Sequence, residues 1–144
     1  MTTKKQLQPK KPLSDLKTFE QSVRKWQTRF RAQSWDITII SVPRETIGGS
    51  IAEGEWSYSE AWARIKLGVP TEDFIPDDTG LHEILHIIHA PLTVRYKEMV
   101  RKYAPQAAAE RFIEEWDAED ERIVRQLVRG ILHNGRERLP EGAS

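Results

Sequence analysis

The run His-Glu-Ile-Leu-His at residues 82–86 constrains how this chain can fold more than any other stretch. Its two histidines point the same way only if the run is helical, because residues four apart lie on one face of an α-helix. Apolar residues at 81, 84, 85 and 88 give that helix a side to bury, and Asp77, Asp78 and Thr79 are candidates for its N-cap. The sequence therefore predicts a buried helix at this point of the chain.

The same spacing indicates a chemistry. His82 and His86 can direct two imidazole nitrogens at one metal ion from consecutive helical turns. Glu83 lies about 100° around the helix from His82, within reach of a water on that ion without being a ligand. In the His-Glu-x-x-His pattern two histidines bind Zn²⁺ and the glutamate is the general base. A chance match is the alternative, expected in about one chain in a hundred of this composition, and the helical context favours zinc.

The residues before the run predict a helix and a small antiparallel sheet. Apolar residues at 16, 19, 23, 26 and 30 form one stripe of a helix of about five turns, with Ser14 as its N-cap. The β-branched stretch 35–42 predicts a strand. A short strand at 47–52 and a turn at 54–59 are expected next. Residues 61–67 alternate apolar with polar or bulky side chains, which is the clearest strand signal in the chain.

The residues after the run predict further helices. Pro91 suits the first turn of a new helix, and Pro105 separates it from a long helix at 107–133 with a broad apolar face. The fold class is therefore α+β. Residues 1–12, with two prolines and four lysines, are expected to form a flexible basic arm, and 135–144 a polar tail. Residues 13–134 form the one expected domain.

A zinc hydrolase site needs a third protein ligand and an open position for water. His89 shares the histidine face, but it lies about 10.5 Å along the helix axis from His82, too far to complete a tetrahedral site. The other source is the acidic stretch 114–121 of the long C-terminal helix. On a helical wheel Asp120 falls near the centre of the apolar face and Glu121 at its edge. A buried acid is unfavourable unless paired or bound to metal, so the wheel alone prefers Asp120, with Glu121 second.

The run followed by an acid on a later helix resembles the gluzincin, or thermolysin-like, zinc metallopeptidases, in particular minimal members from phages and bacteria. In such families the third ligand is a glutamate followed by apolar or small residues three, six and seven positions later. Glu121 precedes Val124, Leu127 and Val128 with this spacing. The resemblance covers roughly residues 35–132 and implies a zincin-like fold. It also implies that His82, His86 and Glu121 bind Zn²⁺ and that Glu83 is catalytic.

This chain departs from that family at one position. The thermolysin-like pattern has an acid four residues after the ligand glutamate, where it orients a zinc histidine. Here that position is Arg125. We therefore expect the histidines to be oriented by another acid, with Asp117 or Asp120 as the candidates.

Composition excludes several classes of protein. No apolar run approaches the ~18 residues of a membrane span, and the first residues lack a signal-peptide core, so we expect a cytoplasmic protein with no membrane partner. The absence of cysteine excludes disulfides, thiol catalysis and cysteine-based zinc modules. Residues 1–34 hold nine Lys/Arg against two acids, and the remainder 13 against 20. Nucleic acid could bind this basic region, although a solvated basic face is the favoured explanation.

The function expected from these observations is a zinc-dependent peptidase acting on a peptide or protein substrate. An extended substrate could pair with the strand at 61–67. One alternative is a non-catalytic zincin-fold scaffold or phage component. Another is a DNA-associated protease that uses residues 1–34. Nothing in the sequence indicates the oligomeric state.

Overall fold

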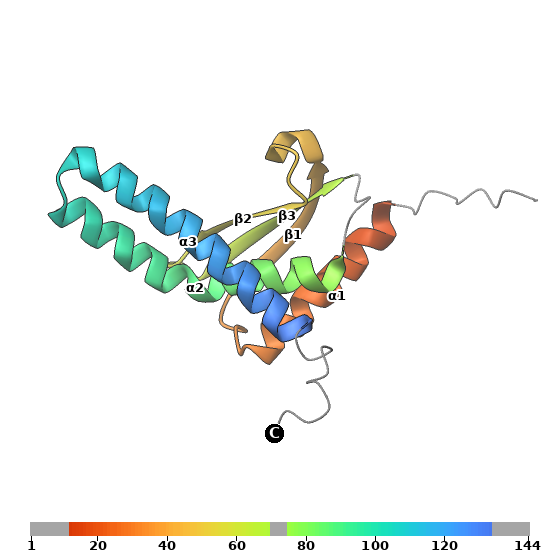
Figure 1. Cartoon of the computed structure of the whole chain (residues 1–144). Helices are drawn as coiled ribbons and strands as arrows, with labels where there is room; N and C mark the ends of the chain where they lie inside the picture. The colour runs from red at the N-terminus through yellow and green to blue at the C-terminus, as the bar shows by residue number, and fades with distance from the viewer. Residues whose placement is uncertain (1–11, 70–74, 134–144) are drawn as a thin grey trace, which may run out of the picture.

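The structure is a computed structural model that describes residues 12–69 and 75–133. Its elements follow in the order α1 (Pro12–Arg29), β1 (Asp36–Pro43), the short 3-10 helix η1 (Arg44–Ile47), β2 (Ala52–Ser57), β3 (Trp62–Val69), α2 (Pro76–Tyr103) and α3 (Gln106–Leu132) (Figure 1). The expected α+β class is confirmed. Apart from Pro12, the predicted arm and tail lie outside the described residues. No described helix combines the length and apolar character that a membrane crossing requires.

The three strands form a mixed sheet, so the prediction of an antiparallel sheet is wrong. Their order is β1-β3-β2, with β3 central, parallel to β1 and antiparallel to β2. β2 and β3 form a hairpin, which leaves only the far edge of β3 for β1. Because the chain crosses over through η1 and β2 before β3 begins, β1 and β3 run the same way.

The second strand lies later in the chain than the sequence predicted. Instead of a strand at 47–52, the chain forms η1 and then turns at Gly48 and Gly49, whose φ angles are 63° and 78°. Both angles are left-handed, a conformation that glycine adopts without a steric penalty. This turn delays β2 until Ala52, and β2 then occupies most of the predicted turn at 54–59.

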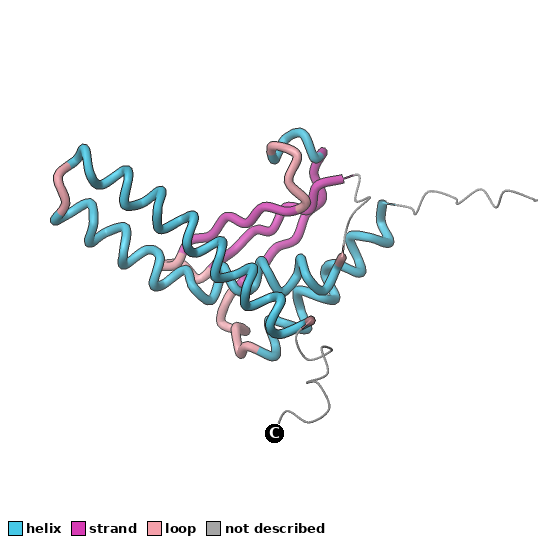
Figure 2. The backbone as a smooth tube through the Cα atoms, viewed as in Figure 1, coloured by secondary structure: helices cyan, strands magenta, loops and turns pink. Residues whose placement is uncertain are grey.

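The core lies between the sheet and the helices that cover one of its faces (Figure 2). The alternation predicted for the third strand is confirmed, since Ala63, Ile65 and Leu67 are all buried. The predicted stripe of the first helix is also largely confirmed, because Phe19, Val23 and Trp26 are buried. That stripe ends sooner than expected: Phe30 lies just beyond α1 and remains 38% exposed.

Helix α2 begins earlier than predicted, at Pro76, so none of the three candidate residues is its N-cap. Asp77 instead lies in the first turn, where it accepts a hydrogen bond from Ser22 (3.0 Å) and pairs with Lys25, both on α1. Burial opposes ionisation of Asp77, but the Lys25 ammonium and the Ser22 hydroxyl outweigh it and lower its pKa. These contacts tie the start of the motif helix to α1.

Helix α2 then runs without interruption to Tyr103, and the prediction of a new helix at Pro91 is wrong. A proline inside a helix removes one backbone hydrogen bond, here the bond to the carbonyl of Ile87. The helix continues because α2 packs along α3, and this tertiary packing offsets the local loss. The two helices form a long hairpin whose far half projects beyond the sheet (Figures 1 and 2).

Helices α1 and α2 approach each other closely at Gly80. A Cβ atom on Gly80 would lie 2.4 Å from Ser22 Oγ and 3.2 Å from the backbone nitrogen of Val23. No real side chain tolerates the first distance, and the Ser22 hydroxyl is held by its bond to Asp77. Glycine at this position therefore permits the contact that positions the motif helix.

We predict that Gly80→Ala lowers the free energy of unfolding by about 1–3 kcal/mol, because the new methyl group forces the two helices apart. Gly130→Ala on α3 is the matched control, since nothing lies within 4 Å of its added Cβ. There the better helix propensity of alanine should stabilise the protein by up to about 1 kcal/mol. Urea denaturation measures both changes, and a stabilised Gly80→Ala protein would contradict the prediction.

Candidate metal centre

The predicted motif helix is confirmed, since residues 82–86 lie within α2. Leu81 and Ile84 are fully buried and hold the run against the core. His82 and His86 project from consecutive turns, and their Nε2 atoms lie 3.1 Å apart. The indole ring of Trp56 on β2 stacks on the His86 ring, with 6.3 Å between ring centroids and 14° between planes. Two imidazole nitrogens therefore converge on one point.

Glu121 on α3 reaches the same point. Its Oε1 atom lies 3.1 Å from His82 Nε2, and its Oε2 atom lies 2.9 Å from His86 Nε2. One ligand atom from each of the three residues can be chosen so that all lie within 4.8 Å of one another, and the group could hold a metal ion. The structure thus brings together the two histidines and the glutamate that the resemblance implied.

Asp120, which the helical wheel preferred as the ligand, has a different position. It faces inward as the wheel predicted, but its two carboxylate oxygens lie 3.1 Å from the Nδ1 atoms of His86 and His89. A carboxylate only accepts hydrogen bonds, so in a neutral His86 ring the proton lies on Nδ1 and the Nε2 lone pair is free. Asp120 therefore orients His86 towards the centre, as carboxylates commonly do beside metal-bound histidines.

The other polar candidates are also accounted for. His89 lies outside the group of three, as its distance along the helix predicted. Asp117 pairs with Lys97 at 2.8 Å, so Asp120 rather than Asp117 contacts the histidine. Arg125 donates a hydrogen bond from Nε to Oε1 of Glu121 at 3.2 Å. The thermolysin-like pattern has an acid at this position. In this chain the position holds a cation, Arg125, which contacts Glu121.

The electrostatics of His82 favour the neutral ring. Burial lowers the pKa of His82, the negative charge of Glu121 raises it, and the neighbouring His86 lowers it. The net result is a pKa below the usual value of 6.5. A neutral imidazole keeps a lone pair available for a metal ion, whereas the protonated ring has none. His82 is thus in the form a ligand needs around neutral pH.

Glu83 is the most perturbed acid of the site. Its side chain is only 6% exposed, and burial, with the charges of Glu121 and Glu53, raises its pKa to about 8. Strand β2 passes this carboxyl at Gly54, where an added Cβ would lie 2.9 Å from Glu83 Oε2. Glycine at 54 therefore lets the strand close over a buried carboxyl that a nearby cation would ionise.

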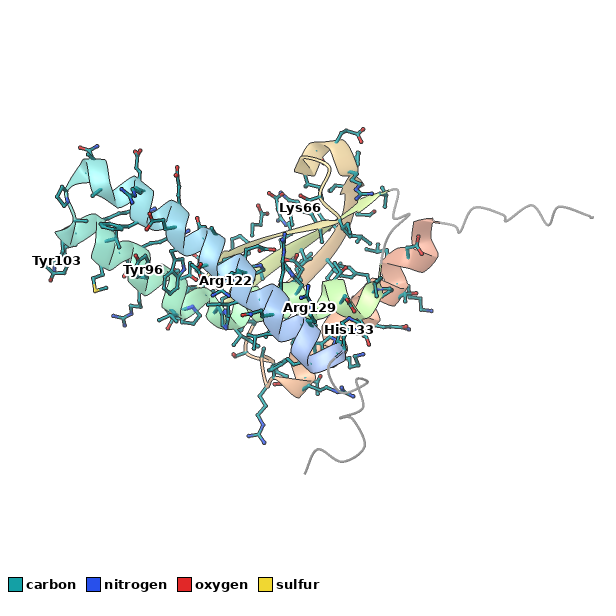
Figure 3. All side chains as sticks on the ribbon, in the orientation of Figure 1. Lys66, Tyr96, Tyr103, Arg122, Arg129 and His133 are labelled. Atoms are coloured by element: carbon teal, nitrogen blue, oxygen red, sulfur yellow. The ribbon has the colours of Figure 1, made fainter. Side chains whose placement is uncertain are left out.

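A cleft of about 500 Å³ opens beside this centre, and His82, Glu83 and Glu121 form part of its wall. Its wall also includes Ser50 just before β2 and Ala52 at the start of β2. Arg129 near the end of α3 and His133 just after α3 line the cleft as well (Figure 3). A second hollow of about 330 Å³ reaches the same three residues from the side of Gly54 and Trp56. The centre is thus accessible along the edge of β2.

Sequence reasoning missed two contributors to this site. Trp56 and Gly54 fell in a predicted turn, and no periodic signal marked them as facing the histidines. The sequence did point to Asp120, because the helical wheel placed this acid on the buried face of the long C-terminal helix. The wheel could not show whether such an acid binds a metal ion or orients a histidine that does.

Comparisons with protein-family models, with curated proteins and with solved structures find no match to this chain. The proposals below therefore depend on the geometry and chemistry of its own residues.

We predict that raising the pH destabilises the metal-free protein through Glu83. The pKa of Glu83 is about 8 in the folded protein, against an ordinary value of 4.5. Between these two pH values Glu83 is therefore protonated in the folded protein and ionised in the unfolded chain. The free energy of unfolding should therefore fall as pH rises from about 4.5 to 8, by at most about 5 kcal/mol at ~1.4 kcal/mol per pKa unit.

Glu83→Gln replaces the titratable carboxyl group by an amide of nearly the same shape. The free energies of unfolding of parent and variant are measured by urea denaturation in EDTA at several pH values. As pH rises, the value for the parent should fall relative to the value for Glu83→Gln. If the difference in free energy of unfolding between the two proteins stays constant with pH, Glu83 does not titrate as described.

Proposed function

We propose that this protein is a zinc-dependent peptidase in which His82, His86 and Glu121 hold Zn²⁺. The observation that carries the proposal is the convergence of these three side chains beside a buried Glu83. Two neutral imidazoles and one carboxylate are a donor set found in zinc hydrolases, which keep a fourth position open. The bond from His86 to Asp120 supplies the outer support that such histidines usually have.

The mechanism assigns a proton transfer to Glu83. Zinc in such a site lowers the pKa of water towards ~7 and polarises a carbonyl group. With Zn²⁺ held by the three ligands, Glu83 would accept the proton of the attacking water and deliver it to the leaving amine. Its burial between α2 and β2 keeps the carboxyl away from bulk water, and Gly54 leaves space for it.

The strand at 61–67, which the sequence suggested as the partner of an extended substrate, cannot have that role. It corresponds to β3, whose two edges are already paired with β1 and β2. Among the described strands, β2 forms the edge of the sheet beside the centre, and Ala52, Gly54 and Trp56 of β2 line the hollows there. An extended peptide added along β2 would pass its carbonyl groups close to His82 and Glu83.

The DNA-associated alternative would use the basic residues of 1–34, five of which the structure describes. On α1, Lys25 pairs with Asp77 and Arg24 donates to the backbone oxygen of Ile37 (2.7 Å). The Arg29 guanidinium lies 5.0 Å from the centroid of the Trp26 ring. These three cations make contacts within the chain.

The metal proposal predicts tight zinc binding that depends on Glu121. Glu121→Ala should weaken zinc affinity by about 100-fold or more, since it removes a ligand, and Asp120→Asn by about 10–100-fold. Glu119→Gln is the control on the same helix, because Glu119 is exposed and pairs with Arg122. Competition with a chromogenic chelator measures the affinities. Equal affinities in the parent and Glu121→Ala would exclude this glutamate as a ligand.

The catalytic proposal predicts that Glu83→Gln retains zinc and loses peptide hydrolysis. Removal of a general base lowers the rate by about 10²–10⁴-fold. Mass spectrometry of a peptide library incubated with the zinc-loaded parent and variant measures the loss. Full turnover in Glu83→Gln would remove Glu83 from the mechanism. A zinc-loaded parent that cleaves none of the library would favour the non-catalytic scaffold.

A further inference from the structure

The α2–α3 hairpin carries most of the large exposed hydrophobic residues among the residues that the structure describes. Seven of the ten large hydrophobic residues that are exposed lie there: Leu92, Met99, Tyr103, Phe112, Ile123, Leu127 and Ile131. The first three are 61%, 54% and 74% exposed. Tyr103 lies at the free end of the hairpin, away from the sheet (Figure 3). Clustered exposure of this kind marks an interaction site rather than ordinary surface.

Six of these residues form one stripe on each helix. At 100° per residue, Leu92, Met99 and Tyr103 lie within about 40° of one another on α2. Phe112 and Ile123 lie within about 20° of each other on α3, and Leu127 lies about 40° further round. The apolar positions of α2 recur with 4-3-4 spacing when Tyr96 is included, which is the repeat of helices packed in bundles.

The two stripes join into one surface. Tyr96 belongs to the stripe of α2 and Trp116 to that of α3, and their rings stack with 4.3 Å between centroids and 19° between planes. Trp116 also donates a hydrogen bond from Nε1 to Thr93 Oγ1 at 3.2 Å. The stripes therefore meet along this seam, and together they form what we name the hairpin face.

The sheet of the same chain cannot cover the hairpin face. Glu83 marks the side of α2 that faces β2, through its approach to Gly54. Leu92 is nine residues further along, which places it about 180° around the helix from Glu83. The hairpin face therefore points away from the sheet.

We propose that the hairpin face binds a second copy of this chain, so that the two hairpins form a four-helix bundle with two-fold symmetry. Two helices alone leave one side of their apolar seam in water, and a second hairpin covers it. Each copy presents the same two stripes, so the same patch is buried on both copies. Such an isologous contact closes with two copies.

The charges beside the stripes determine the arrangement of the two copies. Apart from Lys97, which pairs with Asp117 of its own chain, residues 95–102 of α2 hold three basic residues and one acid. Apart from Asp117, residues 110–119 of α3 hold four acids and one arginine. Stacking α2 on α2 of the other copy would place like charges together. Stacking α2 on α3 of the other copy pairs opposite charges twice, once for each symmetric contact. The two-fold axis therefore runs along the length of the hairpin.

Two charged residues provide the sharpest test of this arrangement. Arg95 borders the stripe of α2 on the side away from α3, and Glu115 borders the stripe of α3 on the side away from α2. Glu115 makes only an exposed pair with Arg111 of its own helix, which changes little on substitution. Both side chains are thus available at the margin of the contact.

Sedimentation equilibrium of the full chain tests the proposal. We expect a monomer–dimer equilibrium, and we expect Leu92→Glu with Met99→Glu to weaken it at least about tenfold, because two charges enter the apolar contact. Ile75→Glu is the matched control, since Ile75 is 57% exposed but lies before α2. Circular dichroism and the melting temperature verify that each variant is folded. A parent that stays monomeric up to about 100 μM, well above micromolar dissociation constants, would overturn the proposal, as would a dimer indifferent to the double substitution.

The arrangement is tested by charge reversal. Arg95→Glu and Glu115→Arg should each weaken the dimer, and the combined variant should recover part of the loss, because opposite charges again face each other. If α2 instead stacked on α2, Arg95→Glu would relieve repulsion and strengthen the dimer, which would overturn the proposed symmetry. None of these measurements depends on zinc or on peptide hydrolysis.

Discussion

Two neighbouring acids of α3, Asp120 and Glu121, approach three histidines of α2 between the helices. Imidazoles and carboxylates are unfavourable in a partly buried place unless each finds a partner. Asp120 provides two of those partners, and its contacts fix the direction of His86. Because the two acids are adjacent in sequence, α3 can orient one histidine with the first and reach the metal position with the second.

The sheet contributes its edge strand β2 to the site. β2 passes the motif helix at Gly54, and this close approach buries Glu83 and raises its pKa to about 8. A carboxyl that is neutral in the metal-free protein becomes a base when a cation lies beside it. Among the described strands, β2 also forms the edge of the sheet next to the centre. One short strand thus both buries Glu83 and borders the hollow beside it.

Local sequence signals predicted the elements whose burial pattern is regular. The stripe of Phe19, Val23 and Trp26 predicted α1, and the alternation of residues 61–67 predicted β3, because one face of each is buried. The signals failed where packing overrides propensity. Pro91 lies inside α2 since α3 packs along it, and β2 is irregular in pattern because Gly54 and Trp56 serve the site.

By itself the sequence determined that His82 and His86 lie one helical turn apart with Glu83 beside them, because helical spacing is local. On the sequence, the resemblance favoured Glu121 as the third ligand, with Asp120 or another acid as the alternative. Only the tertiary structure shows that Glu121 converges with His82 and His86 while Asp120 contacts the other side of His86, since this depends on how α3 is rotated against α2. It also decided the mixed sheet and the exposed hairpin face, because strand order and coverage depend on contacts between residues far apart in the chain.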